Sequence, residues 1–154
     1  MPLERILVPV LGNGCDDEAL RLASDLAKGS KAKVHALYVI EVKRELPLDA
    51  EISRETARAE GVLHRLESLG KDLKCSVEAT LLQARDAGPA VVQEAVERNA
   101  QLIVMQMPYK KRFGAFSLGD TVPYVLKNAP CQVLVCREAM DPSNGLANGS
   151  GPRP

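Results

Sequence analysis

Two patterns of apolar residues alternate along the chain. Short runs of consecutive apolar residues are typical of strands buried on both faces, and apolar residues recurring every three or four positions are typical of helices with one buried side. The runs predict strands at residues 5–10, 32–40, 74–83, 101–105 and 131–137. The recurring pattern predicts helices at residues 18–28, 49–69, 89–98 and 121–128.

Residues that commonly begin or end helices mark the borders of these segments. Gly29 and Gly70 are expected to stop the first two helices, and Asn99 is expected to close the third. Pro89 suits the first position of the third helix, and Asp120 can cap the fourth.

The regular alternation of strand and helix predicts an α/β fold, with one parallel sheet covered by helices on both faces. Ligands of such sheets bind beyond the carboxyl ends of the strands. The loops that follow Val10, Ile40 and Met105 are therefore the places to look for a site.

Composition narrows the function. The chain has 154 residues, enough for one domain, and its 20 basic and 20 acidic residues balance, so nothing favours binding to nucleic acid. No apolar run is long enough for membrane insertion, and the N-terminus lacks the features of a signal peptide. We therefore expect a cytoplasmic protein. Its four cysteines form no CxxC pair and predict no metal site.

No group of residues predicts catalysis. His35 lies within a predicted strand and His64 on the long helix, and neither has a nucleophile beside it in the sequence. Glu94 and Arg98 have helical spacing and are expected to be charges on a helix surface. We therefore predict that the chain is not an enzyme, with a weak ATPase as a distant alternative.

The segment 106–120, "QMPYKKRFGAFSLGD", stands where an α/β protein would hold a phosphate, after a buried strand and before a helix. A phosphate loop needs inward-facing N–H groups and glycines that allow close approach. Here Pro108 has no N–H, and Asp120 places a negative charge at the helix N-terminus. The basic residues 110–112 could reach a phosphate, but we expect them to form a loop tip exposed to solvent.

Five segments resemble the universal stress protein family, and the likeness extends to Arg137. They are "RILVPV", "DEALRLASDLA", "ALYVIEV", "ARDAGPAVVQEAVERNAQLIVMQ" and the closing "LGDTVPYVLKNAPCQVLVCR". The resemblance implies a Rossmann-like, five-stranded parallel sheet of order 3-2-1-4-5. It also implies a homodimer formed by antiparallel pairing of the last strands, from Cys131 to Arg137. We therefore predict a domain over residues 1–137 and, from its Gly, Asn, Pro and Ser content, a disordered tail over residues 138–154.

Family members that bind ATP carry a glycine motif after the fourth strand and an acidic residue after the first. The motif positions fall on Gln106, Tyr109, Gly119 and Asp120, of which only Gly119 fits, and the acidic position falls on Leu11. The resemblance thus implies a degenerate cleft with no cofactor expected. The candidate cleft residues are Val10, Leu11, Gly12, Val39, Gln106, Met107, Gly119, Asp120 and Thr121.

The sequence therefore predicts a regulatory or stress-response module. One alternative is a sensor that binds an adenine nucleotide, either ATP, AMP or a cyclic dinucleotide. A second alternative is a protein partner that regulates a membrane transporter, because the closing segment is similar to universal-stress domains attached to amino-acid transporters.

Overall fold

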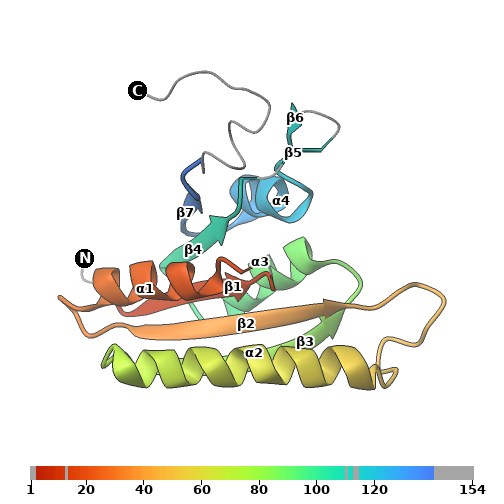
Figure 1. Cartoon of the computed structure of the whole chain (residues 1–154), viewed down its shortest axis with the longest axis horizontal. Coiled ribbons are helices and arrows are strands. Elements are labelled where there is room, and N and C mark those ends of the chain that lie inside the picture. The colour runs from red at the N-terminus through yellow and green to blue at the C-terminus, as the bar shows by residue number, and fades with distance from the viewer. Residues whose placement is uncertain (1–2, 13, 110, 113–114, 141–154) are drawn as a thin grey trace.

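The computed structural model describes residues 3–12, 14–109, 111–112 and 115–140. Its main sheet has five parallel strands in the order β3-β2-β1-β4-β7, as predicted (Figure 1). The strands are β1 (Arg5–Val10), β2 (Lys33–Glu41), β3 (Val77–Ala84), β4 (Leu102–Met107) and β7 (Gln132–Arg137). The helices are α1 (Asp16–Ala27), α2 (Ser53–Asp72), α3 (Ala87–Glu97) and α4 (Thr121–Asn128).

The two faces of the sheet bury separate apolar clusters, because successive side chains of a strand point to opposite faces. In β1, Ile6, Val8 and Val10 pack with α1 and α2, whereas Leu7 packs with α3 and α4. Both clusters are largely aliphatic. The predicted sheet with helices on both faces is confirmed.

Several predicted boundaries are wrong. Helix α2 begins at Ser53 and continues to Asp72, so Gly70 lies inside the helix. Pro89 is the third residue of α3 and not the first. Helix α1 ends two residues before Gly29, and the left-handed φ of 57° that follows the helix belongs to Lys31. Asn99 does close α3: its φ is 54°, and its N–H donates to the carbonyl of Val96.

An additional two-stranded antiparallel sheet lies in the segment after β4. It consists of β5 (Lys111–Arg112) and β6 (Ala115–Phe116), and Figure 1 shows it beside α4, away from the main sheet. The sequence did not predict this hairpin, because each of its strands is only two residues long.

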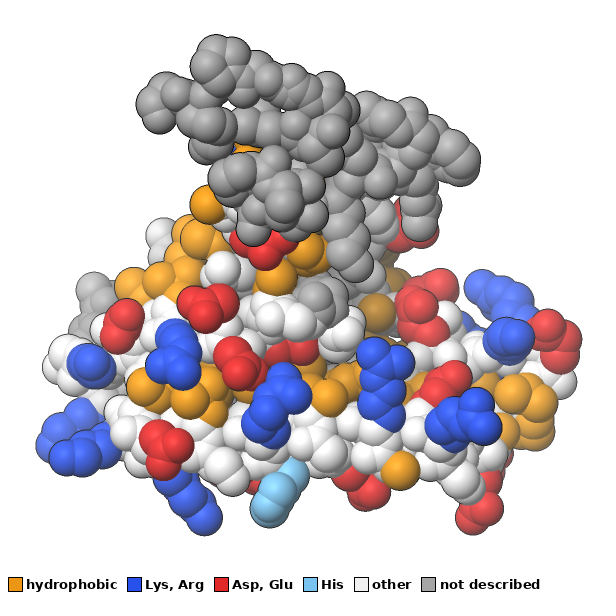
Figure 2. Space-filling view, viewed as in Figure 1, with side chains coloured by type: hydrophobic (Ala, Val, Ile, Leu, Met, Phe, Trp, Pro, Cys, Tyr) orange, Lys and Arg blue, Asp and Glu red, His pale blue; other side chains and the backbone are white. Residues whose placement is uncertain are grey.

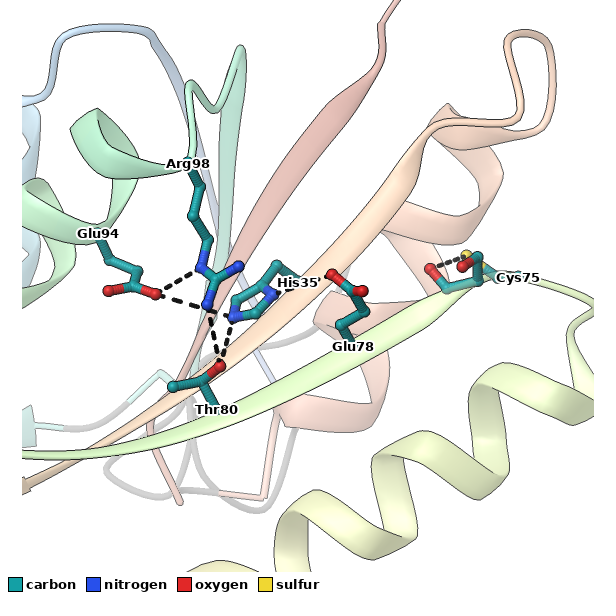
Figure 3. A network of polar contacts seen from close by, with 7 residues as sticks. His35, Cys75, Glu78, Thr80, Glu94 and Arg98 are labelled. Atoms are coloured by element: carbon teal, nitrogen blue, oxygen red, sulfur yellow. Dashed lines mark hydrogen bonds and ion pairs between the residues drawn. The ribbon is translucent and has the colours of Figure 1, made fainter.

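A buried polar cluster lies between α3 and the sheet (Figure 3). Glu94, predicted to be a surface charge, is buried and accepts a 2.5 Å hydrogen bond from Arg98 Nε. Arg98 also donates to Thr80 Oγ1, 3.3 Å away, and that hydroxyl lies 2.8 Å from His35 Nε2. The helical spacing of Glu94 and Arg98 was recognised, but the predicted surface placement is wrong for Glu94, which is buried and faces the sheet.

Burial lowers the pKa of His35 from its ordinary value of 6.5, and the nearby Arg98 guanidinium lowers it further. Glu94 and Glu78 act in the opposite direction but more weakly. The fold therefore favours the neutral imidazole, as expected for a histidine inside a network that already holds a cation.

The surface seen in Figure 2 mixes acidic and basic side chains over α1 and α2, without a large area of one sign. This agrees with the balanced composition of the chain. Among the described residues, no helix combines the length and apolar character that a membrane span requires.

Candidate functional site

The loop after β1 is held by a carboxylate of the same chain. Asp16, the first residue of α1, is only 2% exposed, and its two oxygens accept the N–H groups of Leu11 at 2.9 Å and Gly12 at 3.0 Å. Gly12 has a φ of 68°, which a side chain would make unfavourable. Two backbone donors at the carboxyl end of the sheet are thus already occupied.

Burial raises the pKa of Asp16 above its ordinary value of 3.8, although both backbone hydrogen bonds lower it. The acidic residue that the resemblance placed at position 11 is absent there. Asp16 supplies a carboxylate to the same loop, but it faces the loop's own backbone.

The loop after β4 is held by a second carboxylate, that of Glu138. Its backbone N–H donates to the carbonyl of Met107 at 2.8 Å, and its Oε1 accepts the N–H of Tyr109 at 2.9 Å. Its Oε2 lies 3.8 Å from the sulfur of Cys15, just before α1. Glu138 therefore links the two loops. Glu138 is the first residue of the segment 138–154 that was predicted to be a disordered tail; residues 141–154 lie outside the described part of the chain.

Aromatic and basic side chains cover the same loop. The rings of Tyr109 and Phe116 stack with their centroids 5.2 Å apart and their planes at 6°. The guanidinium of Arg137 lies 4.8 Å from the Tyr109 centroid. The two rings therefore pack against each other and against the guanidinium of Arg137. Of the basic residues 110–112, Lys110 lies outside the described residues, and Lys111 and Arg112 form β5.

The start of α4 lines a different cavity, of about 330 Å³, at the N-terminus of α3. Asp120 and Thr121 contribute to its wall together with Glu41 and Asp86. Glu41 Oε2 accepts the N–H of Ala87 at 2.8 Å and so caps α3. A phosphate in this cavity would meet three carboxylates.

Asp120 occupies the N-cap position of α4, as predicted, but its side chain makes no capping hydrogen bond. Gly119 has a φ of 71°, and its N–H donates to Ser117 Oγ at 3.2 Å. A glycine is therefore favoured here for the turn into α4.

The remaining candidate residues lie at or near the carboxyl ends of β1, β2 and β4. Val10 and Met107 are buried, and Val39 and Gln106 are half-buried. Because β1 lies between β2 and β4, these strand ends are close in space. The described residues that line the cavity at Asp120 and Thr121 include none of these strand residues. The structure therefore divides the predicted site into two parts.

Sequence reasoning missed Asp16, Glu41 and Glu138 as residues that occupy backbone donors. Asp16 lies only five residues after Leu11, so a local search for carboxylates beside the first loop could have found it. Glu138 is 29 residues from Tyr109, and no local pattern connects the two.

Comparison with known proteins gives a consistent result. The model of the universal stress protein family matches residues 2–137. The chain is 30% identical to the universal stress protein MJ0531 of Methanocaldococcus jannaschii over 141 residues, 88% of this chain and 82% of that protein.

Two solved structures are similar in fold. One is a universal stress protein from Archaeoglobus fulgidus in complex with dAMP: TM-score 0.68, 20% identity, 88% of this chain and 98% of that chain. The other is a family protein from Arabidopsis thaliana with AMP bound: TM-score 0.64, 16% identity, 92% of this chain and 99% of that chain.

Proposed function

The chain belongs to the universal stress protein family, and from that premise we propose that it acts as a cytoplasmic regulatory or stress-response module without catalytic activity. We propose further that its cleft is closed to adenine nucleotides. The observation that carries this proposal is the occupation of the loop N–H groups by Asp16 and Glu138. A phosphate would have to displace these carboxylates and would be repelled by them.

The alternative is an adenine-nucleotide sensor. It is supported by the relatives of similar fold that hold AMP or dAMP. The two functions differ in a measurable way, because a ligand that binds only the folded state raises the melting temperature in a concentration-dependent manner.

Millimolar AMP or ATP is expected to leave the melting temperature of the protein unchanged. Glu138→Ala frees the N–H of Tyr109 and removes a negative charge, so this variant is expected to gain a saturable rise with AMP. Differential scanning fluorimetry measures both. Ligand at about 100 times its dissociation constant would add roughly 2.7 kcal/mol, which is several degrees for a chain of this size.

Glu60→Ala is the matched control, since Glu60 is an exposed residue of α2. It should behave like the unmodified protein with and without AMP. A saturable rise in the unmodified protein, or AMP found by mass spectrometry after gentle purification, would favour the sensor and refute the closed cleft.

We also propose a homodimer formed through the edge strand β7. Within the described chain β7 pairs only with β4, and Leu134 on it is 36% exposed. An uncovered apolar edge favours pairing with another strand. Leu126 and Tyr124 of the adjacent α4 are exposed apolar residues that a partner could also cover.

Sedimentation velocity is expected to give a dimer for the unmodified protein at micromolar concentration. Leu134→Pro removes a backbone donor from β7, so it should yield monomers or an unfolded chain. Circular dichroism separates these two cases. A variant that stays folded and dimeric would rule out the β7 interface.

A further inference from the structure

A cavity of about 270 Å³ opens at the amino-terminal edge of the sheet, between the start of β1 and β2 and the C-terminal end of α3. This is the opposite edge from the loops after Val10 and Met107. The apolar part of its wall is formed by Ile6, Leu7 and Ala100. At about 30 Å³ of liquid volume per water molecule, the space suits a ligand of up to about nine non-hydrogen atoms.

His35 lines this cavity and carries a nitrogen with no hydrogen-bond partner among the described residues. The residue is 8% exposed, and its Nδ1 is buried. The nearest carboxylate oxygen, Glu78 Oε1, is 3.8 Å away, beyond hydrogen-bonding distance. Figure 3 shows the ring between Thr80 and Glu78, with Nδ1 on the Glu78 side. Buried polar atoms without partners are rare in folded proteins.

The surrounding contacts are compatible with a neutral ring that is protonated on Nδ1. Arg98 donates to Thr80 Oγ1, so the hydroxyl proton of Thr80 can be donated to His35 Nε2. In this arrangement the proton of the imidazole resides on Nδ1. A buried N–H donor that faces the cavity needs an acceptor oxygen.

Two cations at the cavity could balance the charge of an anion that supplies that oxygen. Arg5 and Lys33 line it, and neither forms a side-chain ion pair within the described residues. Two carboxylates also line the cavity. Glu97 accepts a hydrogen bond from Gln93 at 3.0 Å and keeps its charge, and Glu78 has a side chain that is 57% exposed and can turn toward water.

We propose that this cavity binds a small organic carboxylate. One carboxylate oxygen accepts the Nδ1–H of His35, Arg5 and Lys33 balance the negative charge, and the short apolar part lies against Leu7 and Ala100. The site is independent of the closed cleft, because it shares none of the candidate cleft residues.

Nuclear magnetic resonance of the histidine rings tests the proposal, with butyrate as the probe at about pH 7.5. The chain has two histidines, and exposed His64 on α2 serves as an internal reference. Butyrate is expected to move the His35 ring signals saturably and to leave those of His64 in place. Lys33→Ala should weaken binding roughly fivefold, the upper range for one partly exposed ion pair.

Lys71→Ala, which removes an exposed lysine of α2 outside the cavity wall, is the matched control and should leave butyrate binding unchanged. The proposal is overturned if butyrate fails to move the His35 signals, or if neutral butyramide moves them equally. It is also overturned if inorganic phosphate moves them and butyrate does not, since the ligand class would then be wrong. Lys33 is exposed, so its variant tests the site without disturbing the core.

Discussion

Arg98→Met is expected to destabilise the protein by about 3 kcal/mol, the lower end of the range for removing one partner of a buried ion pair. Arg98 donates to Glu94, whose side chain is 9% exposed, and to Thr80. Methionine fills similar space but leaves the Glu94 carboxylate buried without its cation. Because the Arg98 side chain is itself 39% exposed, the upper end of the range is not expected. Urea denaturation monitored by circular dichroism measures the loss.

The double variant Glu94→Gln with Arg98→Met is the control, since a neutral amide removes the unpaired charge. It should recover a large part of the stability that Arg98→Met loses. If Arg98→Met costs less than about 1 kcal/mol, the pair behaves like an ordinary surface ion pair. The structural account of the cluster would then be wrong.

The single variant Arg98→Met should also change how the stability of the protein depends on pH. The pKa of His35 is lowered in the folded protein, first by burial and then by Arg98. Its contribution to stability is therefore present above the ordinary pKa of 6.5 and is lost as the pH falls through the lower folded-state value. Without Arg98 the pKa of His35 rises and this loss shrinks. The stability deficit of Arg98→Met should thus be smaller at about pH 5 than at about pH 7.

The sheet could be predicted because burial of strands on both faces leaves a local pattern. Residues 5–10 and 102–105 are almost continuously apolar. This is the pattern of a buried parallel strand, because helices cover both of its faces and both therefore need apolar side chains. The hairpin β5–β6 leaves no such pattern, since its strands are two residues long. Helix ends were less predictable. Glycine commonly ends helices, but Gly70 lies inside α2, where the close approach of Val77 leaves no room for a side chain.

The site was only partly predictable, because its decisive contacts join residues far apart in sequence. The mismatch of Gln106 and Tyr109 with the nucleotide motif was visible in the sequence. That Glu138 occupies the N–H of Tyr109 was not, since it depends on how the chain leaves β7. The burial of Glu94 could not be predicted either. It depends on Thr80 of β3 and His35 of β2, which lie on the face of the sheet that α3 covers.

Gly70→Ala is expected to destabilise the protein by about 1–3 kcal/mol, although the same change in an open helix is favourable. A methyl group at Gly70 would lie 2.5 Å from Val77 Cγ2 and 3.0 Å from Val77 Cβ. Rotation of Val77 can move Cγ2 but not Cβ. The turn between α2 and β3 is fixed by the N–H of Cys75 donating to the carbonyl of Gly70 at 2.8 Å. The helix cannot withdraw without breaking this contact.

Gly61→Ala is the matched control, because it lies in the same helix and a methyl group there meets nothing within 4 Å. It should stabilise the protein by about 0.5–1 kcal/mol through helix propensity alone. Calorimetry should therefore give melting temperatures that move in opposite directions, by roughly 2–4 °C per kcal/mol. If both variants become more stable, α2 and β3 pack less closely than the structure indicates. If both variants lose stability, α2 does not tolerate alanine in place of glycine at either position. The loss at Gly70 could then not be attributed to the contact with Val77.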